Sequence, residues 1–148
     1  MILNFNQFAV EGNIFLKDYT KQLNLDGDTA KAGRILSSIL HGLREVIPME
    51  ESLQLIAQFP MFLKAVYVNG WSSRKKNKIR NMTELIDQIR EFDGATSLYD
   101  FESDEIAENY IIATFIALRK YISLGELEDI RAGLPKDLKS MVYHNIMF

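Results

Sequence analysis

The 148-residue sequence contains no cysteine, and this absence removes several classes of chemistry at once. Without thiols there is no disulfide framework, no thiolate nucleophile and no cysteine-ligated zinc. The two histidines, His41 and His144, do not stand in an HExxH or similar metal-binding spacing. The P-loop, GxGxxG and GxSxG patterns are also missing. We therefore predict no catalytic residue, no metal site and no cofactor, and we expect a protein that is not an enzyme.

Long apolar runs are missing too, because Lys64 interrupts the best candidate well short of the ~20 residues that a membrane span needs. Residues 1–13 (MILNFNQFAVEGN) have neither a basic region nor an unbroken apolar core, so they do not resemble a secretory signal. The formal charge of −3 gives no overall attraction for nucleic acid or for an anionic membrane. We expect a cytoplasmic protein without membrane attachment.

The apolar residues recur at helical rather than strand spacing, which predicts an all-α fold of about eight helices in a single domain. Capping residues, prolines and glycines set the expected boundaries. Two helices are expected at residues 49–58 and 61–68. The other six are expected to begin after Asn4 or Asn6, after Asp28 or Thr29, after Asn81 or Thr83, at about Asp104, after Ser123 and at Pro135. The helix from Asp104 is apolar on several sides, which predicts a central position.

Residues 43–71 recur in diverged form at residues 118–146, and the two stretches align without a gap. The matched pairs are Leu43 and Leu118, Arg44 and Arg119, Ile47 and Ile122, Glu51 and Glu126, Ala57 and Ala132, Pro60 and Pro135, Leu63 and Leu138, and Lys64 and Lys139. Such a repeat indicates internal duplication. We predict two related four-helix halves, residues 1–71 and 82–148, joined by a basic linker at 72–81 and packed around a pseudo-twofold axis.

Two charged positions are repeated in both halves. Arg44 and Arg119 stand near the ends of long helices, and Glu51 and Glu126 follow seven residues later at the start of the next helix. One reading gives each half a small polar site. We favour a structural interpretation in which each arginine bonds the last carbonyls or the following glutamate. This predicts the ion pairs Arg44–Glu51 and Arg119–Glu126.

The linker carries the sharpest charge feature of the sequence. After Trp71, its basic residues are Arg74, Lys75, Lys76, Lys78 and Arg80. Phosphate contacts are one interpretation, but no aromatic residue interleaves the run and the domain as a whole is acidic. We interpret the run as a solvated linker, and we name it together with Trp71 as a candidate partner contact.

An acidic stretch comprises Asp100, Glu102, Asp104, Glu105 and Glu108. Compared with an EF-hand loop, it lacks the glycine at the sixth position and the acid at the twelfth. The dipole of a helix that begins near Asp104 explains the clustering without calcium.

Two segments resemble a known bacterial family. They are LHGLREVIPMEESLQLIAQFPMFLKAVYVNGW in the first half and LRKYISLGELEDIRAGLPKDLKSM in the second. Each has a leucine-arginine helix end, a helix containing glutamate, a corner at proline and a further short helix. Over about residues 5–142 the chain resembles domain-of-unknown-function family 2267. The resemblance implies an all-helical fold of two related halves and implies no activity; Gly133 departs from the pattern, since the first half has Gln58 there.

These observations lead us to expect a non-enzymatic interaction or scaffold protein of the bacterial cytoplasm. Besides the missing motifs, the expectation rests on apolar residues near helix ends: Tyr67, Trp71, Tyr143, Ile146, Met147 and Phe148. One alternative is a protein that binds a small ligand in a pocket between the halves. Another is a weak nucleic-acid binder that uses the linker.

Overall fold

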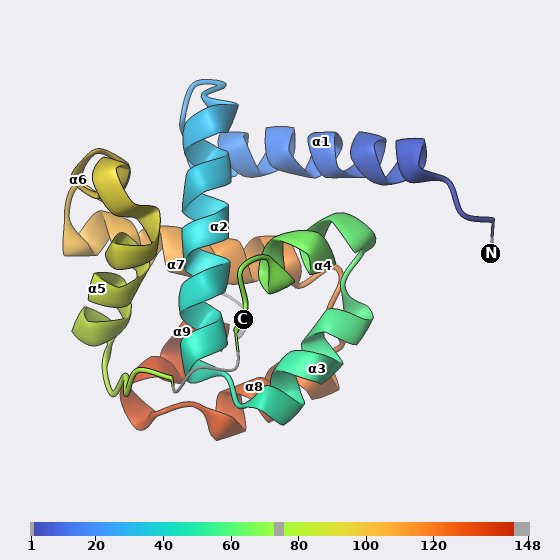
Figure 1. The fold of residues 1–148 in the computed structure, drawn as a ribbon. Coiled ribbons are helices and arrows are strands. Elements are labelled where there is room, and N and C mark those ends of the chain that lie inside the picture. Colours follow the sequence, from blue (N-terminus) through green and yellow to red (C-terminus); the bar gives the residue numbers. More distant parts are fainter. Residues whose placement is uncertain (1, 73–75, 144–148) are drawn as a thin grey trace.

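The computed structural model describes residues 2–72 and 76–143, and every regular element in these ranges is helical (Figure 1). The elements are α1 (Phe5–Gln22), α2 (Thr29–Val46), α3 (Met49–Gln58), α4 (Met61–Val68), α5 (Met82–Asp93), the 3-10 turn η1 (Gly94–Thr96), α6 (Ser97–Asp100), α7 (Asp104–Leu118), α8 (Leu124–Gly133), the 3-10 turn η2 (Lys136–Leu138) and α9 (Ser140–Tyr143). The predicted all-α class is confirmed. Within the same ranges, no helix has the length and apolar character that crossing a membrane requires.

The helix boundaries follow local signals in the sequence. Asn4, Asp28 and Asn81 each accept a hydrogen bond from a backbone N–H in the first turn of the helix that follows. At the other end, Gly70 and Gly94 follow α4 and α5 with φ of 69° and 74°. A glycine adopts this left-handed conformation without steric cost, which is why these helices end there.

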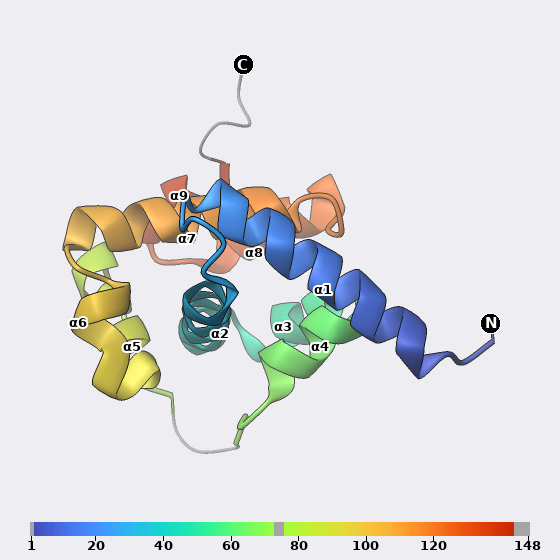
Figure 2. The same ribbon diagram turned by 90° about the horizontal axis from the view of Figure 1, so that it is seen from above.

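Helix α2 lies at the centre of the molecule. Figure 2 shows it nearly end-on, with α5 and α6 on one side and α3 and α4 on the other. Its closest neighbour is α5: a Cβ built at Gly42 would lie 2.5 Å from Cγ1 of Ile89. The prediction of a central α7 is wrong, since Ile112 and Ile116 of α7 are half-buried. The central helix is α2 instead. Gly42 has no side chain, so α5 packs closely against a side of α2 that otherwise carries polar residues such as Ser38 and His41.

The corner at Pro135 differs from its counterpart at Pro60. Pro60 is followed by α4, as predicted, whereas Pro135 is followed by η2 and then by α9. Leu63 and Leu138 are both fully buried, as their spacing after the prolines predicts. The predicted eighth helix is therefore replaced by two shorter pieces up to residue 143, and residues 144–148 lie outside the described part of the chain.

Helices α3 and α8 occupy matching places in the repeated stretch, and they pack against each other (Figure 1). Two contacts between them are reciprocal. Gln58 at the end of α3 accepts a hydrogen bond from the Ser123 N–H at 2.8 Å. Gly133 at the end of α8 approaches Pro48, whose Cγ would lie 3.2 Å from a Cβ at position 133. A local twofold axis between α3 and α8 would produce this pattern, while the duplication itself stays a prediction.

Candidate functional site

The predicted ion pairs are not formed. Among residues 2–72 and 76–143, no ion pair joins Arg44 to Glu51 or Arg119 to Glu126. Arg44 is buried, and its Nη1 donates to the carbonyl oxygens of Tyr67 at 2.9 Å and Asn69 at 2.7 Å. The last carbonyls of a helix have no partner within it. Arg44 therefore secures the end of α4 against α2, and the prediction of a partner in Glu51 is wrong.

Both glutamates instead lack the backbone partner that their position usually offers. Each is the third residue of its helix, where a glutamate commonly reaches back to the N–H of the capping residue. The capping residue of α3 is Pro48, which has no N–H. The capping residue of α8 is Ser123, whose N–H is bonded to Gln58. Neither carboxylate is held by its own helix start, so both are available to a neighbour.

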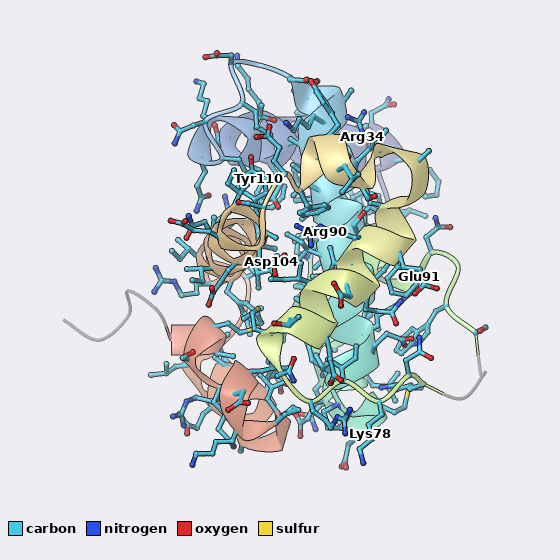
Figure 3. The ribbon with its side chains drawn as sticks, turned by 90° about the vertical axis from the view of Figure 1, so that its left-hand side faces the viewer. Arg34, Lys78, Arg90, Glu91, Asp104 and Tyr110 are labelled. Atoms are coloured by element: carbon cyan, nitrogen blue, oxygen red, sulfur yellow. The ribbon has the colours of Figure 1, made fainter. Side chains whose placement is uncertain are left out.

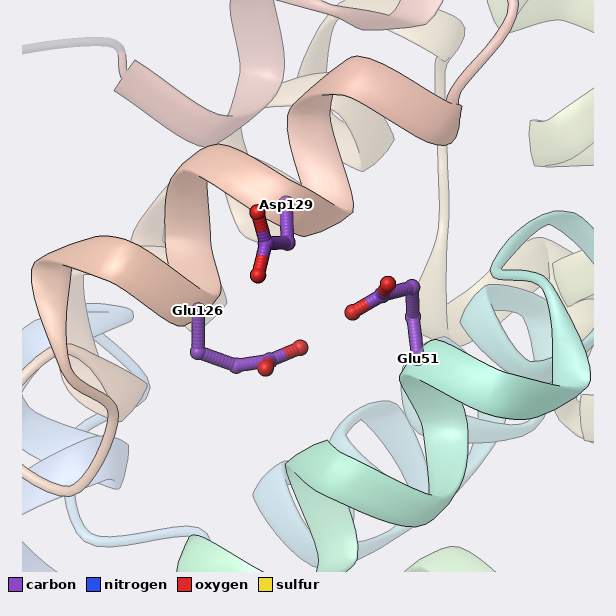
Figure 4. Close-up of side chains that lie close together, drawn as sticks. All are labelled: Glu51, Glu126 and Asp129. Carbon is purple, nitrogen blue, oxygen red and sulfur yellow. The ribbon is translucent and has the colours of Figure 1, made fainter.

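That neighbour is the other glutamate. Figure 4 shows Glu51 on α3 pointing across to Glu126 on α8, with Asp129 one turn further along α8. One carboxylate oxygen from each of the three residues lies within 4.8 Å of the other two. Glu126 is 3% exposed, whereas Asp129 is exposed. We call Glu51, Glu126 and Asp129 the acidic cluster.

Two oxygens of the acidic cluster have no hydrogen-bond partner among the described residues. Oε2 of Glu51 and Oε2 of Glu126 are both buried without a hydrogen-bond partner there. Burial raises the pKa of Glu126 to about 7, and Glu51 and Asp129 add to this rise because their charges oppose a further ionisation. At neutral pH, Glu126 therefore retains its proton in a large fraction of the molecules. The sequence marked both residues as important and assigned the wrong partners.

The described basic residues of the linker are mostly engaged within the protein. Nζ of Lys76 donates to the carbonyl oxygen of Ile47 at 2.8 Å, and Arg80 pairs with Glu84 at 3.0 Å. Lys78 is exposed (Figure 3). Arg74 and Lys75 lie outside the described residues. A nucleic-acid contact through the linker stays a prediction.

The aromatic residues that suggested a partner surface are largely internal. Tyr67 is fully buried, and its hydroxyl lies 2.7 Å from Oγ of Ser52. Trp71 is half-buried and packs edge-on against Tyr67 with 5.7 Å between ring centroids. The interpretation of Tyr67 as surface material is wrong. Ile146, Met147 and Phe148 lie outside the described residues.

His41 also has a structural role. It is half-buried, and its Nε2 lies 2.9 Å from the carbonyl oxygen of Val66, so Nε2 carries the proton. Burial lowers its pKa, which keeps the ring neutral. Its ring meets Phe92 of α5 edge-on. His144 lies outside the described residues.

The acidic stretch is divided between two roles. Asp104 and Glu105 lie in the first turn of α7, where the helix dipole favours them. Asp104 also accepts a hydrogen bond from Nη1 of Arg90 at 2.7 Å (Figure 3). Asp100 is fully buried instead, and Arg34 donates to both of its oxygens at 2.9 Å. No sequence pattern predicts this last pair, because Arg34 and Asp100 are far apart in the chain.

Apolar hollows lie on both sides of the α1–α4 contact. A groove of about 450 Å³ is formed by α1, α2 and α4, where small residues at Gly12, Gly33 and Ala65 leave space beside Phe62. All of its lining residues belong to the first half, so it does not lie between the halves. A second hollow of about 250 Å³ contains Ile14, Pro60, Phe62 and Tyr121. Phe62 thus forms a wall of both.

The start of α1 projects beyond the rest of the molecule (Figures 1 and 2). Large apolar side chains are exposed there, among them Phe5 (72%), Val10 (56%) and Ile14 (58%), and we call the surface formed by Val10 and Ile14 the α1 face. Val10 and Ile14 are four residues apart, so they share one side of the helix. Ile14 belongs to the second hollow as well.

Comparison with known proteins gives one family. The family model described as "Uncharacterized conserved protein (DUF2267)" matches residues 12–141. No curated protein matches the chain. The family match carries no assigned reaction, ligand or partner to these sites.

Proposed function

This chain belongs to the DUF2267 family, and we propose that it is a non-enzymatic protein of the bacterial cytoplasm that binds a helix of a partner protein. The observation that carries the proposal is the α1 face beside the two hollows around Phe62. Exposed apolar groups are individually common on protein surfaces. A contiguous apolar surface that runs into hollows is typical of an interaction site.

The occupant that fits best is an amphipathic helix with an apolar face. Val10 and Ile14 present a helix side to the solvent, and Ile14 leads directly into the hollow next to Phe62. A helix laid beside Val10 and Ile14 could place one apolar side chain in the hollow that Ile14 and Phe62 line, and pack its next apolar side chains, three or four residues away, against Val10 and Ile14. Removing this apolar surface from water would contribute about 25 cal/mol for each Å² buried.

The arrangement gives no support to catalysis as the alternative. The buried polar groups are mostly used to connect helices: Arg44 bonds α4 carbonyls, His41 bonds a further α4 carbonyl, and Arg34 holds Asp100. None of these three lies among the residues of the apolar groove. A binding role would use the exposed apolar surface at α1, which these hydrogen bonds do not involve.

The test is site-specific photo-crosslinking in the native cell. A photoreactive residue at position 10 should give a discrete protein adduct whose crosslinked segment has apolar residues at helical spacing. The same residue at Leu98, an equally apolar exposed position on α6, serves as the control and should give no such adduct. Introducing Ile14→Glu should reduce the adduct at position 10 by about tenfold or more, since a charge would then be buried in the contact.

Two outcomes would contradict the proposal. If position 10 gives no adduct beyond those seen at position 98, the α1 face is not a binding surface. If the adduct contains a second copy of this chain alone, the surface mediates self-association and not partner binding. Sedimentation of the purified protein at several concentrations separates the second outcome from the proposal.

The groove also supports a small apolar ligand as a second candidate. Its volume of about 450 Å³ falls within the ~300–1,000 Å³ of typical ligand pockets, and Ser37 and Asn69 supply polar groups. Ala65→Phe, which would fill the groove from its α4 wall, should then abolish the fluorescence of a bound apolar dye. If the dye signal is equal in both proteins, or absent from the start, this candidate fails.

A further inference from the structure

We propose that Glu51, Glu126 and Asp129 bind one divalent cation of the calcium class at the contact between α3 and α8. The three carboxylate oxygens lie within 4.8 Å of one another, so small side-chain adjustments would bring all three to one ion. Ca²⁺ accepts oxygen ligands at ~2.3–2.6 Å in flexible geometries, whereas Mg²⁺ requires near-octahedral bonds of ~2.0–2.1 Å, so a site that still has to adjust favours Ca²⁺.

A second observation points to a ligand, independently of the acidic composition. Glu126 is 3% exposed, and its carboxylate points toward Glu51 (Figure 4). Its Oε2 is buried without a hydrogen-bond partner in the described residues. Oε2 of Glu51 is in the same situation. Buried polar atoms are normally bonded, and buried charges are normally paired. A cation between the two carboxylates would satisfy both oxygens together.

No salt bridge among the described residues involves Glu51, Glu126 or Asp129. The salt bridges in residues 2–72 and 76–143 involve other acids: Asp100, Glu84, Asp104 and Glu128. The donor set consists of oxygen alone, which suits calcium, magnesium or manganese better than zinc or copper. Because Asp129 is exposed, water can reach the ion from its side and complete the coordination.

The cation would join two helices that the fold already aligns. Ser123 caps α8, and its N–H donates a hydrogen bond to Oε1 of Gln58 on α3. At the other end of the contact, Pro48 packs on Gly133. These contacts hold α3 against α8 at both ends, with the acidic cluster between them. The ion would therefore cross-link the two halves of the chain. This inference is independent of partner binding at α1, so either can fail without the other.

The test uses the purified full-length protein, freed of cations with a chelator and held at pH 8. CaCl₂, MgCl₂ and MnCl₂ are each titrated by calorimetry and by thermal melting. We expect saturable binding of one Ca²⁺ per chain, with a rise in Tm of roughly 5–10 °C at a hundredfold excess over Kd. Glu126→Gln should abolish the response, and Asp129→Asn, on an exposed residue, should weaken binding by about tenfold. The matched control is Glu50→Gln, an exposed neighbour of Glu51 outside the cluster, which should bind as the wild type does.

A second readout follows from proton release. Titrations at pH 7 in two buffers of different ionisation heat should show that binding displaces a fraction of a proton, and Glu50→Gln should show the same. The proposal is wrong if no divalent cation binds with saturation, or if Glu126→Gln binds like the wild type. It is equally wrong if Glu126→Gln raises the Tm while no protein responds to cations, because the cluster is then a proton-sharing pair alone.

Discussion

Asp100 shows how a single buried charge is accommodated in this protein. Its carboxylate is fully buried at the end of α6, and Nε and Nη2 of Arg34 each donate to one of its oxygens at 2.9 Å. Burial by itself would raise the pKa of Asp100, but the hydrogen bonds and charge of Arg34, together with hydrogen bonds from Asp93 and Thr96, lower the pKa. The neighbouring Asp93 has its pKa raised to about 6 by burial and by Asp100. The charge of Asp100 thus depends on Arg34.

Removing Arg34 should therefore be costly. Arg34→Ala leaves the carboxylate of Asp100 buried without its cation, and we expect a clear loss in the free energy of unfolding. The loss should be smaller than for a fully buried pair because the Arg34 side chain is 37% exposed. Urea unfolding at pH 7 measures it. Arg80→Ala, which breaks the more exposed Arg80–Glu84 pair, is the control and should lower the free energy of unfolding much less than Arg34→Ala does. Equal losses in both variants would contradict this account.

At the residue scale, the sequence identified several of the important polar residues but not their partners. Arg44, Glu51 and Glu126 were marked by their repetition, and all three have specific structural environments. Their partners depend on how α3, α4 and α8 pack, which no spacing within one helix encodes. The Arg34–Asp100 pair had no sequence signal at all, because it connects the middle of one helix to a turn far along the chain.

At the element scale, the contact between α2 and α5 depends on a missing side chain. Gly42 faces Ile89, and a Cβ there would lie 2.5 Å from Cγ1 and 3.3 Å from Cδ1 of that residue. Ile89 is fully buried, so its side chain could move away from an added Cβ only by displacing its own neighbours in the core. By contrast, a Cβ at Gly33, earlier in the same helix, would meet nothing within 4 Å. The two glycines therefore respond differently to the same substitution.

Gly42→Ala should destabilise the protein by about 1–3 kcal/mol, since overpacking outweighs the gain in helix propensity. Gly33→Ala should instead stabilise it by about 0.5–1 kcal/mol, because the propensity gain is unopposed. Thermal and urea unfolding of the two variants check the opposite signs. If both substitutions stabilise the protein, α2 and α5 are not in the close contact described above.

Element boundaries were the part of the fold best predicted from sequence. The predicted ranges 49–58 and 61–68 are those of α3 and α4, because Pro48, Pro60 and Gly70 act locally. The last predicted helix failed for a tertiary reason. Nζ of Lys139 donates to the carbonyl oxygens of Arg131 and Ala132 at the end of α8. This backward contact coincides with the break between η2 and α9, and local propensity does not reveal it.

At the scale of the whole molecule, stability should depend on pH through the acidic cluster. Burial, with Glu51 of α3 and Asp129 of α8 facing it, raises the pKa of Glu126 from 4.5 to about 7. The folded state therefore binds a proton more tightly than the unfolded state does. The corresponding stabilisation is fully present below about pH 4.5 and is lost as the pH rises through 7. Asp93, whose pKa is raised to about 6, acts in the same direction.

In chelator-treated protein, the stabilisation that comes from Glu126 should be lost between pH 5.5 and pH 8. His41, whose pKa is lowered by burial, acts in the opposite direction, so the effect is measured as the difference in Tm between the wild type and Glu126→Gln. Glu126→Gln removes the titrating group and keeps a hydrogen-bonding amide, so it should raise the Tm at pH 8 and change it little at pH 5.5. Melting curves across this range provide the measurement. Glu50→Gln should follow the wild-type profile. An unchanged slope in Glu126→Gln would show that the pH dependence originates elsewhere.

The central place of α2 affects the order in which the chain can fold during its synthesis. Ser38, His41 and Gly42 of α2 meet Asp93, Phe92 and Ile89 of α5, which emerge from the ribosome some time later. Until then this side of α2 has no permanent neighbour. Closing the long segment between the two helices also costs chain entropy before the contact forms. The two halves are therefore expected to fold together after translation has passed α5, and not one after the other.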